Sequence, residues 1–314
     1  MTRFRSQAGQ ATVLTVVAIT ALAGMAGLVL DVGSWFRAQR DTQATADASA
    51  LAAAQALPGS TGDASTLAAD YLAKNGGGNS TVTFSSKFAA NDSVTVHVSR
   101  PAPGFFAKIF GVASVDVGAT ATARSAGLQS ARWVAPIVVN HQHPLLNCGT
   151  LHGKPTPCFN QETQLDLINL HDPGSGNAAG SFGLINLDRT NGGNVGASDL
   201  AEWVLKGFDQ YMDLGRYDSA PSANFNNSQF QGSLSTRMNA GDNLLFPIYE
   251  TLIGSGSNDQ YDIIGWVGFR VTHFNPNGSK SFVKGYFTSV TWQGIQSQSG
   301  AGLNYGVRAI QLVE

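Results

Sequence analysis

The residue types best suited to chemistry lie in one short stretch near the middle of the chain. Cys148 and Cys158 are the two cysteines of the 314-residue sequence, and they flank a segment with two prolines and one lysine. In an oxidising compartment, a disulfide between such cysteines is the default expectation. Loop-closure entropy would give this bridge about 3 kcal/mol of stabilisation.

A metal site is the alternative hypothesis for this stretch, because imidazole and thiolate groups are ligands that zinc prefers. The candidate ligands are His141, His143, Cys148, His152, Cys158 and His171. Their spacing matches no common zinc motif. The disulfide is therefore favoured, and neither a metal nor another cofactor is expected.

The sequence carries no motif of the common catalytic classes. H-E-x-x-H, G-x-x-x-x-G-K-[ST] and G-x-S-x-G are all absent. The run from Gly174 through Gly176 to Gly180 is one residue off a dinucleotide fingerprint and follows no clear strand, so a loop rich in Gly and Ser explains it better. Carboxylates could form a catalytic pair only through tertiary proximity; the candidates are Asp166, Asp172, Asp188 and Glu202. A non-enzyme is favoured.

An apolar run at the start of the chain determines how the other elements are positioned. Twenty consecutive uncharged residues, 11–30, follow Arg3 and Arg5. At about 1.5 Å per residue, a helix of this length spans the hydrocarbon core of a bilayer. A cleaved signal peptide with its site at Ala21-Leu22-Ala23 is the alternative, but the run continues well past that site. We therefore predict a retained transmembrane helix over residues 11–30 rather than a buried core helix.

The orientation of this helix follows from the basic residues and the cysteines. Arg3 and Arg5 favour a cytoplasmic N-terminus of residues 1–10, although Arg37 and Arg40 beyond the span reduce the bias. A disulfide would favour an exported C-terminal part. The prediction is a single-pass protein of the cell membrane with an extracytoplasmic C-terminal domain.

Two features of the span could serve assembly with other proteins. Asp31 is a carboxylate at the membrane edge that could pair with a cation on a partner helix. Alternatively, its place at the end of the span lets the carboxylate reach water, and this is the interpretation that we favour. Ala23 and Gly27 form a small-xxx-small pair that could pack against another helix in lipid, although alanine and glycine are common in such spans.

Residues 31–126 are predicted to form a small α+β unit. The helix should continue from Asp31 to Leu57 and pack under a globular domain. Its stripe consists of Trp35, Thr42, Ala46, Ala50, Ala53 and Leu57. A second helix is expected over Ser65–Lys74, capped by Ser65 or Asp63. A helical turn is expected at Phe105–Phe110. Strands are predicted at residues 81–88, 93–99 and 112–123.

Residues 127–314 are predicted to form a β-rich domain with about two helices, at 199–214 and 229–238. The clearest hairpin runs from Tyr261 to Trp292 around the turn Asn275–Gly278. Further strands are expected at residues 133–139, 182–187, 244–251 and 307–313, with a loop-rich stretch over 140–180. The fold class is α+β: a long N-terminal transmembrane and amphipathic helix, the small unit, then this domain.

Composition excludes one large class of partner. Charged residues make up only 13% of the chain, and the formal net charge is −2. Nucleic-acid binding needs a basic surface that such a balance gives no reason to expect.

Several stretches resemble the N-terminal module of the TadE/TadG-like family of Flp (tight-adherence) pilus-assembly proteins. These stretches are Gly9-Gln10, the apolar span, Leu30–Trp35, Arg37, Arg40 and Ala46–Ala54. The resemblance implies a membrane-anchored assembly or minor pilin-like component. Its implied partners are the lipid bilayer and other pilus-assembly or pilin-like membrane proteins.

The sequence departs from this family's relatives at two places. Pilin-like precursors are typically cut after a glycine with glutamate five residues beyond, but Leu14 stands at that distance from Gly9. Processing after Gly9 is therefore left open. Some larger relatives carry a metal-binding Asp-x-Ser-x-Ser motif, whereas Asp63–Leu67 lacks the second serine.

Three functions are therefore considered. A structural or assembly protein of the pilus type comes first. The second is an anchored surface module that binds a sugar or protein through exposed Trp266, Tyr286 or Trp292. The third is an exported hydrolase, which would need a cleft around His141 and His143.

Overall fold

The chain forms two compact units in the computed structural model, which describes residues 8–151, 154–168, 180–189, 195–254, 259–277, 280–297 and 305–313. The first unit comprises residues 1–87, 91–124 and 311–314, and the second comprises 88–90 and 125–310. The predicted division between residues 126 and 127 lies two residues beyond the observed one. The α+β fold class is confirmed, with a long apolar N-terminal helix and a β-rich C-terminal region.

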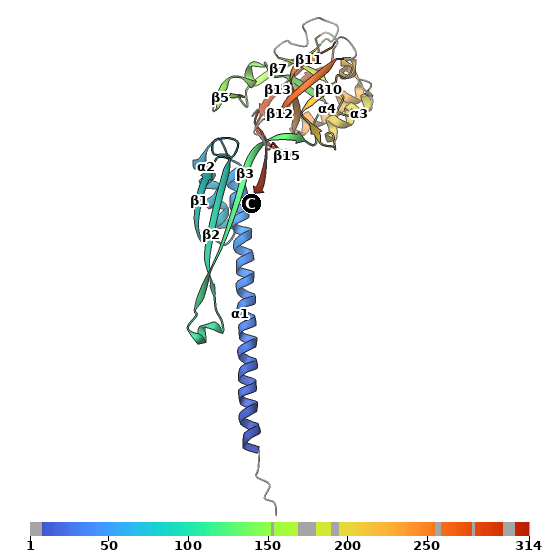
Figure 1. Cartoon of the computed structure of the whole chain (residues 1–314). Coiled ribbons are helices and arrows are strands. Elements are labelled where there is room, and N and C mark those ends of the chain that lie inside the picture. Colours follow the sequence, from blue (N-terminus) through green and yellow to red (C-terminus); the bar gives the residue numbers. More distant parts are fainter. Residues whose placement is uncertain are drawn as a thin grey trace, which may run out of the picture. The chain divides into compact units, whose positions relative to one another are not determined.

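Helix α1 (Ala8–Ala54) runs for 47 residues without interruption (Figure 1). Its first half is apolar and exposed, with Val13, Leu22 and Val29 each about 60–70% exposed. Its second half buries a stripe of small residues that includes Ala46 and Ala50. Within the described residues, α1 is the helix long and apolar enough to cross a membrane.

Helix α2 (Thr61–Lys74) begins four residues earlier than predicted. The predicted caps, Ser65 and Asp63, are wrong because Ser60 takes that place: its hydroxyl accepts a hydrogen bond from the Asp63 N–H at 3.1 Å. The helix ends as expected, and the three glycines that follow Asn75 all adopt positive φ.

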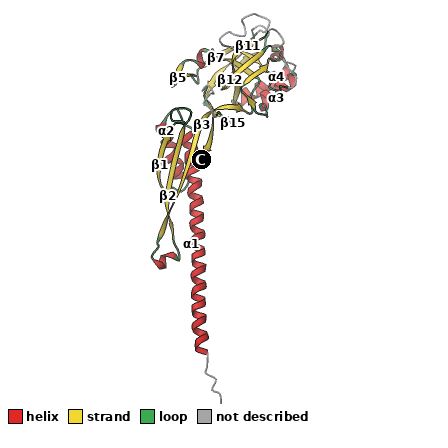
Figure 2. Ribbon diagram, viewed as in Figure 1, coloured by secondary structure: helices red, strands yellow, loops and turns green. Residues whose placement is uncertain are grey.

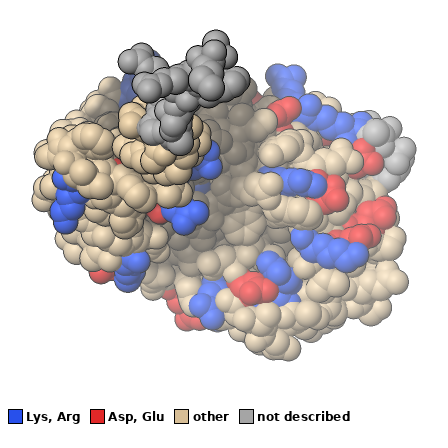
Figure 3. All heavy atoms as spheres, turned by 90° about the horizontal axis from the view of Figure 1, so that it is seen from below, with Lys and Arg blue, Asp and Glu red and all other residues tan. Residues whose placement is uncertain are grey.

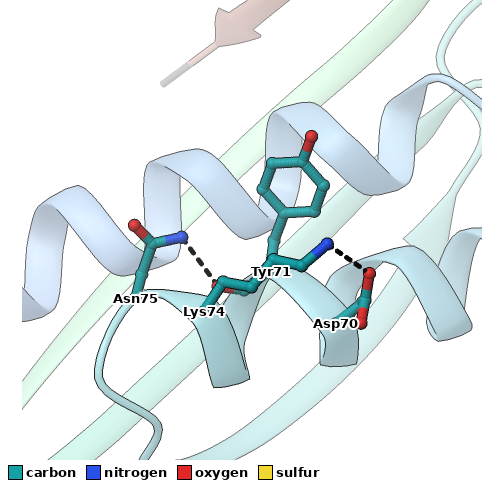
Figure 4. A network of polar contacts seen from close by, with 4 residues as sticks. All are labelled: Asp70, Tyr71, Lys74 and Asn75. Carbon is teal, nitrogen blue, oxygen red and sulfur yellow. Dashed lines mark hydrogen bonds and ion pairs between the residues drawn. The ribbon is translucent and has the colours of Figure 1, made fainter.

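The last turn of α2 is held by short polar contacts (Figure 4). Lys74 Nζ lies 2.8 Å from the Asp70 carboxylate and 5.2 Å from the centre of the Tyr71 ring. The Asn75 side chain donates to the Tyr71 carbonyl at 2.7 Å. Because the ion pair is exposed, solvent screens it and its contribution to stability is small. The Thr45 hydroxyl of α1 donates to the Asn75 carbonyl at 2.8 Å, which joins the end of α2 to α1.

An antiparallel sheet completes the first unit (Figure 2). Strand β1 (Asn79–Ser85) pairs with β2 (Ser93–Pro103), and β2 pairs with residues 114–124 of β3 (Ser114–Ala131). Along β2 the buried side chains alternate, with Val94, Val96 and Val98 turned inward. The turn between β2 and β3 contains the 3₁₀ helix η1 (Ala107–Phe110), where a helical turn was predicted.

Side chains of α1 bond to backbone carbonyls of this hairpin. Trp35 Nε1 donates to the Pro103 carbonyl at 3.1 Å. One turn later Gln39 donates to Gly118 at 2.6 Å, and Gln43 donates to Thr120 at 3.2 Å. The spacing of four residues places these donors on one helix face, so the register between helix and sheet is fixed at several points.

The second unit is built on a closed ring of six strands. Their hydrogen-bonded order is β12-β11-β4-β8-β7-β13, and β13 pairs back onto β12, while β10 extends the sheet from β12. The strands are β4 (Ile137–Asn140), β7 (Glu162–Leu167), β8 (Ser181–Leu184), β10 (Gly215–Asp218), β11 (Asn243–Ile253), β12 (Gln260–Asn275) and β13 (Phe282–Thr288). The antiparallel pairing of β12 with β13 forms the predicted hairpin.

Short strands complete the second unit. They are β5 (Gly149–Leu151), β6 (Lys154–Thr156), β9 (Met212–Asp213), β14 (Val290–Thr291) and β15 (Gly294–Gln296). The last strand, β16 (Val307–Val313), lies where a strand was predicted, and its residues from 311 on belong to the first unit. Strands β5, β6 and β7 lie in the stretch predicted to be loop-rich. Strands β5 and β6 have only three residues each, which is too short for a sequence period to reveal them.

Both faces of the ring are buried. On β11, Leu244 and Phe246 belong to one core cluster and Leu245 to the other. Helices α3 (Ala197–Lys206) and α4 (Ser228–Ala240) pack into the first cluster through Leu200, Val204, Phe230 and Leu234. A strand buried on both faces reads as a continuous apolar run rather than an alternating one.

The predicted helix at 199–214 is too long by eight residues. Gly207 ends α3 with φ +81°, and a Cβ there would lie 2.6 Å from the Trp133 Cα. The chain then turns into an extended segment: Phe208 exchanges backbone hydrogen bonds with Val134 and Trp133, and Met212 begins β9. The apolar spacing continued past the residue that breaks the helix.

Candidate functional site

Asp31 binds the turn between β2 and β3 through its carboxylate. Oδ1 accepts the N–H of Phe105 at 2.8 Å and that of Phe106 at 3.3 Å, and Oδ2 accepts the N–H of Ala107. These N–H groups stand at the start of η1, where a helical turn supplies no internal acceptors. The side chain of Asp31 is only 1% exposed. Hydrogen bonds to an ionised acceptor are among the stronger ones in proteins.

Gly27, one helical turn before Asp31, forms a seat for the Phe106 ring. It is buried, whereas its neighbours on both sides are exposed. A Cβ on Gly27 would lie 2.7 Å from Phe106 Cγ, a distance that real Cβ atoms essentially never show. The ring therefore rests on the helix backbone, and only glycine leaves room for it.

A groove of about 920 Å³ lies between α1 and this turn. Most of its lining is apolar, and its charged lining residues are Arg37 and Asp41. The lining residues are Val29, Leu30, Gly33, Ser34, Arg37, Ala38, Asp41, Ala102, Pro103, Phe105 and Phe106.

The structure differs from the expectation for Asp31. We expected this carboxylate to reach water or to pair with a partner's cation, but N–H groups of the same chain occupy both of its oxygens. For the small-xxx-small pair, Gly27 is covered by Phe106 while Ala23 is exposed. Sequence reasoning missed this turn as the partner of both residues. The available signal was the apolar run from Phe105 to Phe110 between two glycines.

The two cysteines form a disulfide in the second unit, with their Cα atoms 5.9 Å apart. The bridge closes the two-stranded β5–β6 hairpin, and the Cys158 N–H donates to the Leu145 carbonyl at 2.8 Å. Bonded sulfurs are not thiolates, so Cys148 and Cys158 in this state cannot serve as zinc ligands.

His143 is a structural residue beside this hairpin. Its Nδ1 accepts the Leu145 N–H at 3.1 Å, so the proton of the neutral ring resides on Nε2, which lies 3.0 Å from the Thr163 hydroxyl. Its ring meets the edge of Phe287, with centroids 5.1 Å apart. Burial lowers the pKa of His143 to about 4. Both nitrogens are thus engaged within the protein.

The remaining metal and catalytic candidates are not brought together in the described part of the chain. There, no three His, Cys, Asp or Glu residues gather in a metal-binding group. Glu202 pairs with Lys206 on the surface of α3 at 2.9 Å, and Asp166 is exposed on β7. Five candidates lie outside the described residues: His152, His171, Asp172, Gly174 and Gly176.

The candidate binding aromatics form no open row. Trp266 is 3% exposed, and its Nε1 points to the Leu128 carbonyl at 3.4 Å. Trp292 is half-buried and donates to the Arg132 carbonyl at 2.6 Å. Tyr286 is also half-buried. Burial of these rings counts against the binding-module hypothesis.

Charges of both signs are distributed over the face drawn in Figure 3. Basic and acidic side chains lie interspersed there among uncharged ones.

Replacing Asp31 by Asn should loosen the turn. The amide keeps one acceptor oxygen, but its NH₂ group would face backbone N–H groups of the turn that the second carboxylate oxygen now accepts. Losing a hydrogen bond to a charged group costs about 1.5 kcal/mol, which raises the population of the opened turn about tenfold. Trypsin cleavage after Lys108 of the purified full chain in detergent should therefore be about tenfold faster in Asp31→Asn.

The matched control for this change is Asp116→Asn, which neutralises an exposed carboxylate on β3. Cleavage after Lys87, at the opposite end of β2, provides an internal reference. Equal cleavage after Lys108 in wild type and Asp31→Asn would show that the carboxylate does not hold the turn.

His143 should make the second unit less stable in mild acid. Its pKa is about 4 in the folded protein and 6.5 in its ordinary state. Between these values the unfolded chain binds the proton and the folded chain does not, so the free energy of unfolding falls as the pH drops from about 6.5 to about 4. Above pH 6.5 both states are neutral and this contribution is constant.

Urea unfolding of the detergent-solubilised chain, followed by tryptophan fluorescence, measures this effect at about pH 7 and about pH 5. His143→Asn keeps an acceptor for the Leu145 N–H without titrating, so its midpoint should shift less with pH. His273→Asn, at an exposed histidine, should shift as the wild type does. Identical shifts in all three proteins would contradict the assignment.

Comparison with known proteins assigns the N-terminal part of the chain. Residues 9–56 match the family model described as "Putative Flp pilus-assembly TadE/G-like", which confirms the predicted N-terminal module. No curated protein and no solved structure matches the chain. The apolar helix and the family match together indicate a membrane-anchored pilus-assembly component whose N-terminal module is of the TadE/TadG-like type.

Proposed function

We propose that this protein is a single-pass, extracytoplasmic structural or assembly component of an Flp-type pilus, and that it acts without catalysis. The observation that carries the proposal is the division of α1 into two halves. One continuous helix exposes apolar side chains over its first half and buries small ones against its own sheet over the second.

The exposed half is suited to lipid. The side chains of residues 13–30 that are large and apolar are each about 60–70% exposed. In water such a surface would be costly, at about 25 cal/mol for each Å². In a bilayer it is covered by acyl chains, and the helix satisfies its own backbone hydrogen bonds.

The buried half joins this anchor to the first unit without a flexible link. No proline interrupts α1, and the family match covers both halves of the helix. Movement of the anchor is therefore carried directly into the sheet. This property supports a role in which the protein transmits position or force within a membrane assembly, rather than one in which a tethered domain diffuses freely.

A non-catalytic role is supported by two buried polar residues of the second unit, which are used within the fold. His143 bonds to Leu145 and Thr163, and Asn140 donates to the Tyr249 hydroxyl at 3.2 Å. Burial raises the pKa of the Tyr249 and Tyr261 hydroxyls, so both stay neutral at physiological pH.

Purification of the tagged full chain from its native membrane tests the assembly role. Pilus-machinery proteins should co-purify after mild cross-linking and detergent extraction. A control bait should carry the same tag on the second unit alone, without α1, and should lose these partners. Equal recovery of the partners by both baits, or their absence from both, would contradict the proposed anchoring module.

The disulfide tests the orientation. If the second unit is extracytoplasmic, cells quenched with an alkylating reagent should yield protein with no modified cysteine, because oxidising compartments preserve disulfides. After reduction, two alkyl groups should appear by intact mass. Protease added to cells with a permeable outer layer should cleave the second unit while the membrane is intact. Free thiols together with protection from protease would show that the second unit lies in the cytoplasm, which contradicts the proposed orientation.

A further inference from the structure

The turn between β2 and β3 exposes a dense set of large apolar side chains. Phe110 is 81% exposed, Ile109 is 78% and Phe105 is 66%. Phe106 and Val112 are each more than 40% exposed. Lys108 is the one charged residue from Phe105 to Val112, a stretch without acids. A contiguous apolar patch of this kind marks a contact surface.

This turn lies beside the lipid-facing half of α1. Phe106 contacts Gly27, which stands three residues before the end of the predicted span at Leu30, or about 4.5 Å along the helix axis. Figure 1 shows the turn lying alongside α1 and pointing toward the N-terminal end of the helix. The Asp31 carboxylate holds it there by three hydrogen bonds. If the span crosses a bilayer, the exposed rings beyond Phe106 lie at the depth of acyl chains.

The backbone of the turn is prepared for an apolar medium. A buried N–H without an acceptor costs several kcal/mol in lipid. Here Asp31 accepts three of these groups, and carbonyls within the turn accept others. The donors to those carbonyls are Gly104, Ile109, Gly111 and Val112.

The side chains also fit an interface between hydrocarbon and headgroups. Phe and Ile insert into the boundary, while a long Lys side chain lets its ammonium reach phosphate oxygens. The acid-free sequence around Lys108 suits an anionic lipid surface and counts against a basic protein surface.

We infer that this turn, residues 105–112, inserts into the same leaflet as the C-terminal end of the α1 span and forms a second membrane contact. Lipid acyl chains cover Phe105, Ile109 and Phe110, and Lys108 lies at the phosphate level. The inference rests on α1 spanning the membrane and goes beyond it, because a single helix needs no such turn.

Spin labelling of the full chain tests this contact. The native cysteines are paired, so one introduced cysteine carries the nitroxide. The sites are Phe110→Cys and Ile109→Cys in the turn, Val17→Cys in the span and Lys87→Cys at the opposite end of β2. Each protein is reconstituted into vesicles of phosphatidylethanolamine and phosphatidylglycerol. Power saturation compares collisions with oxygen, which enriches in lipid, and with a water-soluble nickel chelate.

The ratio of oxygen to chelate accessibility should be several-fold higher at Ile109, Phe110 and Val17 than at Lys87. A low ratio in the turn with a high ratio at Val17 would overturn the inference and leave the anchor intact. A low ratio at Val17 as well would overturn both the membrane contact of the turn and the membrane-spanning role of α1. Low accessibility to both reagents in the turn, with immobile labels, would reveal a protein partner instead of lipid and also overturn the inference. Wild-type tryptic resistance after Arg124, which lies in β3 and is unchanged in all four variants, verifies that each variant is folded.

Discussion

The carboxylate of Asp31 takes three backbone N–H groups from the turn between β2 and β3, and the first unit is arranged around that exchange. A charge buried beside an apolar span is costly unless it is hydrogen-bonded. The start of η1 supplies donors that would otherwise need water. Each partner therefore removes the other's desolvation cost. With Phe106 seated on Gly27 one turn away, the pair fixes how far the hairpin reaches along the helix.

The same helix has to serve two surroundings, and its residue sizes reflect this. Branched and long apolar side chains occupy the part that faces outward. Alanine, serine and threonine occupy the part that meets the sheet, where a small side chain lets helix and strands approach closely. Between these parts, Trp35, Gln39 and Gln43 donate to carbonyls of the hairpin. These donors satisfy backbone acceptors on the same stretch where the helix changes from one surrounding to the other.

Local signals predicted the elements well and their contacts poorly. The apolar run and the alanine stripe predicted α1, and Asn275–Gly278 predicted the hairpin of β12 and β13, because each signal lies within a few residues of its effect. The role of Asp31 could not be predicted, since its partners lie more than seventy residues away in sequence.

The end of α3 was missed because one residue, Gly207, overrides an apolar period that continues through Phe208 and Tyr211. The cap of α2 was misplaced because Ser60, Asp63 and Ser65 are all acceptable caps, and local propensity does not choose among them. The closed ring of the second unit depends on pairings between distant strands that no local pattern encodes.

The buried side chains where α1 meets its sheet are small or β-branched: alanines on α1 and β3, and Val94, Val96 and Val98 on β2. Ala46, Ala50 and Ala53 on the helix are buried, as are Ala119, Ala121 and Ala123 on β3. An alanine has no rotamers to lose, so ordering these side chains carries no side-chain entropy cost. It also has no rotamers to adopt in response to load. The valines of β2 are themselves stiff at χ1. A displacement of the helix therefore finds few alternative rotamers at this junction, which behaves as a stiff coupling rather than a compliant one.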